Sequence, residues 1–213
     1  MIRLVVFDAD GTLTEHSSIW WRLHQVFGTT EEGKRYYDMF FAGEISYDEW
    51  AELDAALWRG QPLEAVMQVV HDTRLVLGAQ ETVRALHRRG IKTAILSGGL
   101  DVLADDVARR LGVPYVVTNR LIHHNGILTG EVETRVGWNE KADIIKQIAA
   151  DHDVTLAETA FVGDGRNDVG AMSVVGLAIA FRPEHEDVAK VAHVVVSDND
   201  LRAILPYIIS SDP

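Results

Sequence analysis

The sequence predicts an α/β fold: a doubly wound, mostly parallel sheet with an all-helical cap inserted after the first strand. Three observations predict it. Short β-branched apolar runs recur along the chain, amphipathic helical segments separate them, and one long helical interval interrupts the alternation. Strands that alternate with helices are typical of βαβ units, and these units build parallel sheets.

The strands are expected where apolar runs are short and nearly continuous, because helices cover both faces of a parallel sheet. The runs of this kind are IRLVVF (2–7), KTAILS (92–97), PYVVT (114–118), TAFVG (159–163), GLAIA (176–180) and HVVVS (193–197). Amphipathic patterns predict helices over 79–90, 100–112 and 140–152, and Gly90 is the expected stop of the first of them.

Two segments depart from this alternation. Residues 15–71 show only helical periodicity, so we expect a helical cap domain there and a core domain made of residues 1–14 and 72–213. Within residues 119–132, the dipeptide Asn125-Gly126 separates two alternating runs. This pattern predicts a β-hairpin, because both residues accept the left-handed conformation that a tight turn requires.

Composition limits the classes of function. The chain has 213 residues, which is enough for one core and a small second module. A net charge of −12 argues against binding to nucleic acid or to an anionic membrane surface. The chain has no cysteine, so we expect neither disulfide bonds nor thiolate chemistry. The apolar run at the start is too short for a signal peptide, and no stretch approaches the roughly 18 apolar residues of a membrane span. We therefore expect a cytoplasmic monomer or homodimer.

Polar residues gather at the carboxyl ends of the predicted strands, which is where ligands bind in open α/β sheets. Carboxylates follow the first strand and the strand at 159–163, a Ser-Gly-Gly sequence follows the strand at 92–97, and a lysine opens the helix after the hairpin. These residues are Asp8, Asp10, Ser97, Gly98, Gly99, Lys141, Asp164 and Asp168. We expect them to lie in one crevice.

A cluster of carboxylates needs a cation, because two unit charges 4 Å apart repel by about 4 kcal/mol even at an effective dielectric constant near 20. Hard oxygen ligands with room for water are typical of Mg²⁺ sites. Lys141, the Ser97 hydroxyl and the backbone N–H groups that follow Gly98-Gly99 are suited to a phosphate. The sequence therefore indicates phosphoryl transfer.

The order of these motifs resembles a known family. DADGTL (8–13), the strand-ending Ser97, Lys141 and GDGRND (163–168) resemble the four-motif signature of the haloacid dehalogenase superfamily. The helical interval, the LSGG sequence (96–99) and the NRL hairpin resemble its phosphoserine phosphatase-like branch. The resemblance implies a Mg²⁺-dependent phosphohydrolase that cleaves a small phosphomonoester through an aspartyl-phosphate intermediate.

The resemblance also implies a role for each motif residue. Asp8 is the expected nucleophile, Asp10 the general acid and then the general base, and Lys141 the cation that offsets charge. The implied Mg²⁺ ligands are the Asp8 carboxylate, the Asp10 backbone carbonyl, Asp164, and Asp168 directly or through water. The expected contacts of the phosphoryl group are Ser97, Gly98, Gly99 and Asn167.

The cap departs from the phosphoserine phosphatase-like pattern. Where that branch has a glutamate for the substrate ammonium, this chain has Ser17, so we take Glu15 as a candidate substrate contact. Where the branch has an arginine for the substrate carboxylate, residues 43–53 contain Glu52 and no basic residue. Because Glu52 would repel a carboxylate, phosphoserine is a doubtful substrate.

The cap aromatic residues allow two interpretations. At helical spacing they are typical of a cap core, although they could instead line a pocket for an apolar or ring-shaped leaving group. The residues are Trp20, Trp21, Phe40, Phe41, Tyr47 and Trp50.

Other functions stay open beside hydrolysis. The aspartyl-phosphate could be passed to an acceptor alcohol, which would make the chain a phosphotransferase. A catalytically silent binding protein of the same fold is less favoured, because such a protein should have lost Asp8, Asp10 or Lys141. The sequence lacks a GxxxxGK[ST] loop, and its first strand leads into aspartates rather than GxGxxG, which argues against NTPase and dinucleotide-binding classes.

Overall fold

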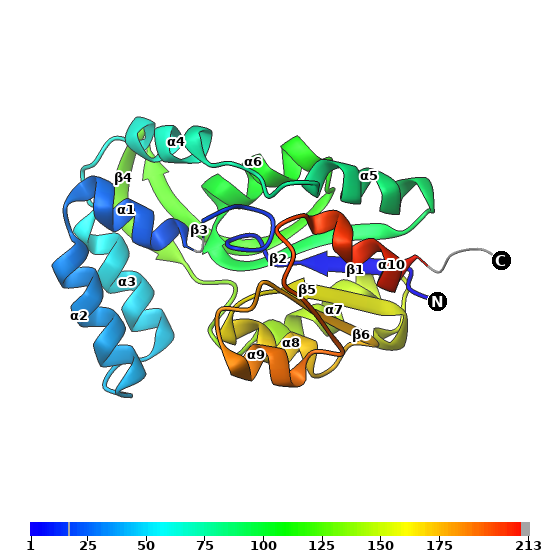
Figure 1. Cartoon of the computed structure of the whole chain (residues 1–213). Coiled ribbons are helices and arrows are strands. Elements are labelled where there is room, and N and C mark those ends of the chain that lie inside the picture. Colours follow the sequence, from blue (N-terminus) through cyan, green and yellow to red (C-terminus); the bar gives the residue numbers. More distant parts are fainter. Residues whose placement is uncertain (17, 210–213) are drawn as a thin grey trace.

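The computed structural model describes residues 1–16 and 18–209 (Figure 1). The predicted equivalence of Ser17 with the family's substrate-binding glutamate falls outside these residues. Among the described residues, no helix combines the length and the apolar character that a membrane span requires.

In the described part of the chain, seven strands form one sheet in the order β4-β3-β2-β1-β5-β6-β7. Neighbouring strands pair in parallel except β3 with β4. The strands are β1 (Leu4–Phe7), β2 (Lys92–Leu100), β3 (Tyr115–His124), β4 (Ile127–Glu133), β5 (Thr159–Gly163), β6 (Leu177–Phe181) and β7 (Val194–Val196). The predicted mostly parallel sheet is confirmed, with β1 at its centre between β2 and β5.

The helices cover both faces of this sheet, as Figure 1 shows. The core helices are α5 (Ala79–Arg88), α6 (Asp101–Leu111), α7 (Lys141–Asp151), α8 (Val169–Met172), α9 (Glu186–Val191) and α10 (Leu205–Ile208). Successive side chains of β1 point to opposite faces of the sheet, which explains the two layers of helices. Val5 and Phe7 belong to the apolar core that contains residues of α5, α6 and α10, whereas Leu4 and Val6 belong to the core that contains residues of α7, α8 and α9.

The third strand is longer than the sequence pattern predicted. The expected strand at 114–118 and the first arm of the hairpin are one continuous strand, β3. The hairpin itself is confirmed: β3 and β4 pair antiparallel, and φ is positive at both Asn125 (49°) and Gly126 (78°). Positive φ at both turn residues matches the right-handed twist of the two strands, which is why an Asn-Gly turn suits this position.

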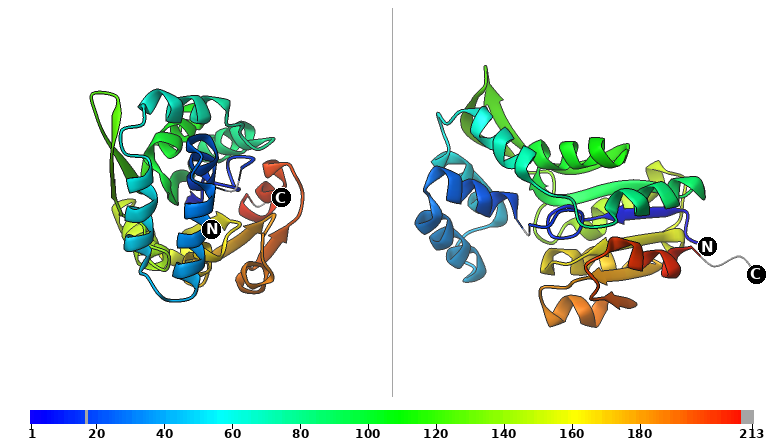
Figure 2. Two further views of the ribbon diagram at one scale, coloured as in Figure 1. Left: turned by 90° about the vertical axis from the view of Figure 1, so that its left-hand side faces the viewer. Right: turned by 45° about the horizontal axis from the view of Figure 1, so that its top comes forward.

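Four helices lie in the interval predicted to form the cap, and the last ends one residue beyond it. They are α1 (Ile19–Phe27), α2 (Thr30–Phe41), α3 (Tyr47–Leu57) and α4 (Leu63–Asp72). In Figure 2, α1, α2 and α3 stand beyond one end of the sheet, and α4 returns along α6.

The segment between α3 and α4 is hydrogen-bonded to the β3–β4 hairpin. The Gly60 N–H donates to the Leu128 carbonyl at 2.9 Å, the Leu128 N–H donates to the Gln61 carbonyl at 2.9 Å, and the Leu63 N–H donates to the Gly126 carbonyl at 2.8 Å. The hairpin thus extends from the core sheet and joins the cap through backbone hydrogen bonds.

Candidate active site

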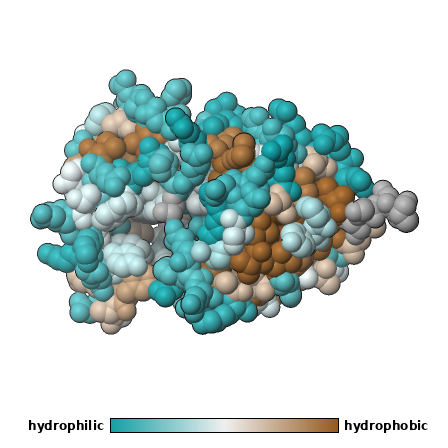
Figure 3. Space-filling view, in the orientation of Figure 1, coloured by the Kyte–Doolittle hydropathy of each residue, from teal (hydrophilic) through white to brown (hydrophobic). Residues whose placement is uncertain are grey.

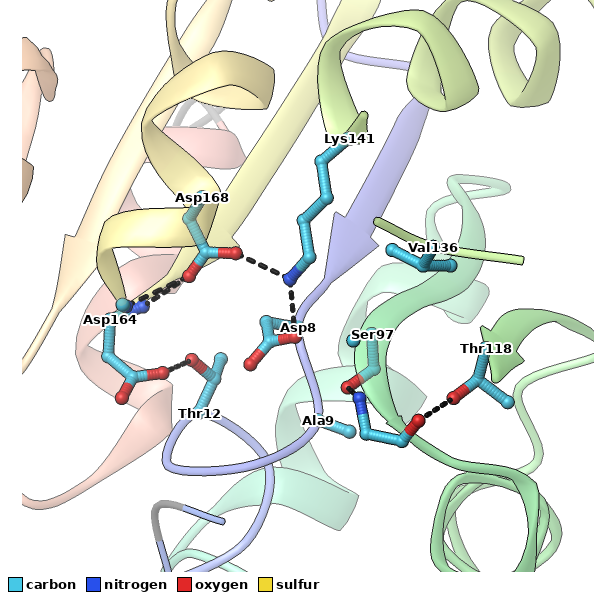
Figure 4. A network of polar contacts seen from close by, with 12 residues as sticks. Asp8, Ala9, Thr12, Ser97, Thr118, Val136, Lys141, Asp164 and Asp168 are labelled. Carbon is cyan, nitrogen blue, oxygen red and sulfur yellow. Dashed lines mark hydrogen bonds and ion pairs between the residues drawn. The ribbon is translucent and has the colours of Figure 1, made fainter. Parts of the chain in front are cut away.

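Asp8 and Lys141 form the centre of the site. Asp8 follows β1, and its N–H donates to the Val162 carbonyl of β5 at 2.9 Å, which fixes its backbone. Lys141 is the first residue of α7, and its Nζ lies 2.7 Å from Asp8 Oδ1 and 2.6 Å from Asp168 Oδ1 (Figure 4). The Lys141 side chain is fully buried. Burial by itself would lower the pKa of Lys141, but the charges of Asp168 and Asp8 outweigh it and raise that pKa.

The loop after β5 brings two further carboxylates to this centre. Asp168 Oδ2 accepts hydrogen bonds from the N–H groups of Asp164 at 3.0 Å and Gly165 at 2.9 Å. Asp164 Oδ1 accepts one from the Thr12 hydroxyl at 2.6 Å, as Figure 4 shows. Asp168 therefore holds the Asp164 loop and the Lys141 ammonium together, while Thr12 links Asp164 to the first motif.

The donor set fits a divalent cation. Carboxylate oxygens of Asp8, Asp164 and Asp168 lie within 4.8 Å of one another, and all three residues are buried. Lys141 neutralises only part of this charge. Burial, followed by the charges of Asp8 and Asp168, raises the pKa of Asp164 well above its ordinary value. Buried carboxylate oxygens with surplus negative charge are the environment that Mg²⁺ occupies in proteins.

Asp10 lies apart from this cluster. Its Oδ1 accepts a hydrogen bond from the Ile19 N–H of α1 at 3.1 Å, and its Oδ2 faces Gly99, where a Cβ atom would collide with it. Burial, followed by the charge of Asp8, raises the pKa of Asp10 to about 7. A carboxyl group that keeps its proton near neutral pH is suited to donate it. The role of the Asp10 backbone carbonyl as a metal ligand stays a prediction.

Burial also raises the pKa of Asp8, to about 6, although the Lys141 charge opposes that rise. Asp8 differs from Asp10 in its contacts, because Lys141 bonds its Oδ1 directly. The environment therefore favours the ionised form of Asp8 more than that of Asp10. The two carboxyl groups therefore differ in protonation although only one residue lies between them.

The predicted phosphate contacts meet at the same cavity as Asp8. Ser97, Gly98, Gly99 and Asn167 all line it. Ser97 is buried, and its hydroxyl oxygen accepts a hydrogen bond from the Gly99 N–H at 3.1 Å. These residues belong to the end of β2 and the loop after β5, so the sheet brings together segments that are far apart in the sequence.

The structure does not bring Glu15, the predicted substrate contact, to this cavity. Its side chain is exposed and lines a separate surface groove with His71, Asp72 and Arg74. The Glu15 N–H donates to the Arg74 carbonyl at 3.0 Å, and Thr14 forms a β-bridge with Leu75. These backbone contacts direct the chain away from the cavity before the cap begins.

Glu52, the cap acid expected near the substrate, does not line this cavity either. Glu52 is exposed, whereas Asp54, two residues later, is buried and lines the cavity. Two residues correspond to about 200° around a helix, so the two acids lie on opposite faces of α3. The cap acid that faces the cavity is therefore Asp54, and its Oδ1 lies 3.2 Å from His24 Nε2.

Sequence reasoning missed two buried residues that organise the site. Thr12 lies within the DADGTL motif, but only the structure shows its hydrogen bond to Asp164. Asn119, in the NRL sequence, accepts hydrogen bonds from the N–H groups of Arg135 at 2.8 Å and Val136 at 2.9 Å. Its amide donates to the Gly98 carbonyl at 3.0 Å, and this hydrogen bond joins the hairpin to the Ser97-Gly98-Gly99 segment. The sequence could have indicated these two residues through their positions, because Thr12 lies within DADGTL and Asn119 within NRL.

The chain is similar to known phosphatases over nearly its whole length. The family model described as haloacid dehalogenase-like hydrolase matches residues 5–173. A phosphoserine phosphatase of Methanocaldococcus jannaschii is 33% identical over 207 residues, which cover 97% of each chain. A phosphoserine phosphatase of Lactococcus lactis is 35% identical over 179 residues, which cover 84% of this chain and 82% of that one.

Solved structures agree with the sequence relatives. A phospho-aspartyl intermediate analogue of phosphoserine phosphatase superposes with a TM-score of 0.86 at 32% identity, covering 97% of this chain and 99% of that one. A substrate-bound phosphoserine phosphatase complex superposes with the same TM-score of 0.86 and covers 98% of this chain. The chain therefore belongs to the haloacid dehalogenase-like hydrolase family, as its four motifs predicted.

Proposed function

We propose that this chain is a Mg²⁺-dependent phosphohydrolase that cleaves a small phosphomonoester through an aspartyl-phosphate on Asp8. In this proposal residues 15–71 act as a cap over the core of residues 1–14 and 72–213. The observation that carries it is the buried Asp8 carboxylate at the cavity, 2.7 Å from Lys141 and grouped with Asp164 and Asp168. The similarity to phosphoserine phosphatases supports the same reaction class.

Asp8 is placed to attack phosphorus. Lys141 bonds its Oδ1, so the other carboxylate oxygen is the candidate nucleophile. As the bond from this oxygen to phosphorus forms, the bond from phosphorus to the ester oxygen breaks. Ser97, Gly98, Gly99 and Asn167 would contact the phosphoryl oxygens, because these residues line the cavity beside Asp8.

Asp10 would move the proton in both half-reactions. Its protonated carboxyl group gives the proton to the departing ester oxygen, which leaves as an alcohol. The resulting Asp10 carboxylate then removes a proton from a water molecule that attacks the phosphorus of the aspartyl-phosphate. The products are inorganic phosphate and a free Asp8, and Asp10 recovers its proton.

The carboxylates of Asp8, Asp164 and Asp168 would hold the metal, and the resemblance adds the Asp10 carbonyl. A bound Mg²⁺ supplies positive charge that offsets the charge on the nucleophile and on the phosphoryl oxygens. Lys141 would supply a second positive charge through its contacts with Asp8 and Asp168.

Release of phosphate from a panel of phosphomonoesters, with Mg²⁺ or with a chelator, tests the proposal. We expect Mg²⁺-dependent release that the Asp8→Asn variant abolishes. The matched control is Asp143→Asn, because Asp143 is an exposed acid on α7 outside the cavity. Release that persists in Asp8→Asn, or none from any ester, would contradict the proposal. Identification of the products in the presence of alcohols separates hydrolysis from transfer.

A further inference from the structure

The cavity between cap and core has room for a leaving group beside the phosphate site. Its volume is about 470 Å³, and Asp8, Asp10, Ser97 and Asn167 line it on the core side. Figure 3 shows the hollow between the cap and the core on the face turned to the viewer. Pockets of this size take small molecules, and the chemistry of the walls decides which ones.

Several aromatic side chains line the cap side of this cavity. The aromatic wall, as we call it, consists of Tyr37, Phe41, Tyr47, Trp50 and, from the core, Trp138. The Phe41 and Trp138 rings lie 5.3 Å apart at 90°, and the Tyr37 and Trp50 rings lie 5.7 Å apart at 83°. These are edge-to-face pairs, an arrangement that a further ring from a ligand can extend.

The aromatic wall is not simply the core of the cap. Tyr37 is 46% exposed and Phe41 43% exposed, whereas Trp58, which packs inside the cap, is fully buried. Trp21 also lines the cavity and is 42% exposed. The interpretation of the cap aromatics as core residues is therefore wrong for Trp21 and Phe41. Both residues line the cavity and keep ring surface uncovered by the protein.

The charges on the cap side disfavour an acidic leaving group. Two of the cap basic residues that line the cavity, Arg22 and His24, already have partners, whereas His16, which also lines it, is exposed. His24 lies 3.2 Å from Asp54, and the Arg22 guanidinium donates to the Val69 carbonyl at 3.3 Å and the Thr73 hydroxyl at 2.5 Å. A ligand carboxylate beside Asp54 would meet a like charge, and the two basic side chains nearest to it on the cap, Arg22 and His24, already have partners.

We propose that the cap cavity selects phosphomonoesters whose leaving group is a flat aromatic ring without a carboxylate. This inference rests on the proposed phosphohydrolase function and adds the substrate class. The aromatic wall supplies ring contacts, Asp54 opposes an acidic substituent, and the phosphate site holds the ester on the core side of the same cavity.

Benzyl phosphate and cyclohexylmethyl phosphate form the decisive pair of substrates. Both are esters of primary alcohols with six-membered rings, so they differ in the flatness and π-electrons of the ring rather than in the leaving oxygen. We expect kcat/KM for benzyl phosphate to be higher by roughly threefold to tenfold, the factor that one or two aromatic contacts supply. Phosphoserine, which carries a carboxylate, should be the poorer substrate.

Adjacent tyrosines on α2 provide matched variants. Tyr37 lines the cavity, whereas Tyr36 does not and lies against Arg35. Tyr37→Leu should lower kcat/KM for benzyl phosphate more than it lowers kcat/KM for cyclohexylmethyl phosphate. Tyr36→Leu should change neither. Equal rates for the two ring esters, or a lead of phosphoserine over both, would overturn the inference. A phosphoserine lead would direct attention to Arg166, whose half-exposed side chain lines the cavity on the core side.

Binding of phosphonates separates this inference from the proposed function. Benzylphosphonate and cyclohexylmethylphosphonate cannot be hydrolysed, so calorimetry measures ring selection without turnover. Tighter binding of benzylphosphonate, with no hydrolysis of any ester, would refute the proposed phosphohydrolase function and support the selection of flat aromatic rings. Hydrolysis of esters together with equal binding of the two phosphonates would retain the phosphohydrolase and refute the ring selection.

Discussion

Lys141 shows how one residue joins stability to chemistry. Its ammonium is fully buried and lies within 2.7 Å of Asp8 and 2.6 Å of Asp168. A buried ion pair is costly to build, but removing one partner costs more, because the remaining charges are then buried without compensation. The same contacts that orient Asp8 therefore make the fold depend on Lys141.

Lys141→Met should destabilise the protein by roughly 3–5 kcal/mol, because Asp8 and Asp168 lose their shared cation. The measurement is the free energy of unfolding in urea. Lys146→Met is the control, since Lys146 is half exposed on the same helix and pairs only with Asp143; its effect should stay within about 0.5 kcal/mol. Equal stability of the two variants would show that the buried pair contributes little.

Asp10→Asn should lower kcat by about 10²- to 10⁴-fold for an alkyl phosphate, because the leaving alkoxide then lacks its proton donor. The loss should be smaller for 4-nitrophenyl phosphate, whose leaving group departs without protonation. The ratio of the two losses is the measurement. An equal loss for both esters would indicate that Asp10 positions the substrate rather than donates a proton.

At the scale of the elements, the cap and core meet through a few polar contacts as well as through packing. The Gly98 carbonyl accepts hydrogen bonds from the Trp20 indole of α1 at 3.1 Å and from the Tyr47 hydroxyl of α3 at 3.3 Å. Asn119 of β3 donates to the same carbonyl. Two cap helices are thus hydrogen-bonded to the Ser97-Gly98-Gly99 segment. The position of the cap is therefore linked to the geometry of the site.

Tyr47 should make stability depend on alkaline pH. Burial raises the pKa of Tyr47 to about 12 in the folded protein, whereas an unfolded tyrosine ionises near pH 10. Between these values the unfolded chain loses a proton that the folded protein keeps, so stability falls as pH rises from about 10 to about 12. Tyr47→Phe should show a shallower fall. Urea unfolding at pH 9.5 and 11 measures it, and identical slopes in both proteins would contradict the assignment.

Gly33 sets the distance between α1 and α2. A Cβ atom at Gly33 would lie 2.6 Å from His24 Nε2. Alanine favours a helix by about 1 kcal/mol over glycine, but overpacking typically costs 1–3 kcal/mol, so Gly33→Ala should destabilise the cap. Thermal unfolding of Gly33→Ala, His24→Ala and the double variant is the test. If the collision with His24 is the cause, the double variant loses less than the sum of the single variants.

Across the whole molecule, the surplus of buried negative charge links folding to metal binding. We expect Mg²⁺ to raise the free energy of unfolding, by about 2.7 kcal/mol when its concentration is 100 times the dissociation constant. Asp164→Asn should remove most of this gain. Asp143→Asn, at an exposed position on α7, should retain it. An equal Mg²⁺ effect in both variants would place the cation elsewhere.

The sequence by itself determined the sheet and the helical character of residues 15–71, and it predicted which residues gather at the carboxyl ends of the strands. Backbone patterning is local, so apolar runs and amphipathic segments located β1, β2, β5 and most other elements. In a parallel sheet, residues at the carboxyl ends of neighbouring strands must meet. Asp8 and Asp164 follow the neighbouring strands β1 and β5 and therefore converge, although they lie far apart in the sequence.

Only the tertiary structure decided which cap residues face the cavity. The path of the chain after Thr14 moves Glu15 to another surface, and the rotation of α3 places Asp54 rather than Glu52 inside. Asn119 likewise acquires its partners through contacts far apart in the sequence. The same physical reason applies to these cap residues. Periodicity determines that a helix has an apolar face, but the packing against other elements decides where that face points.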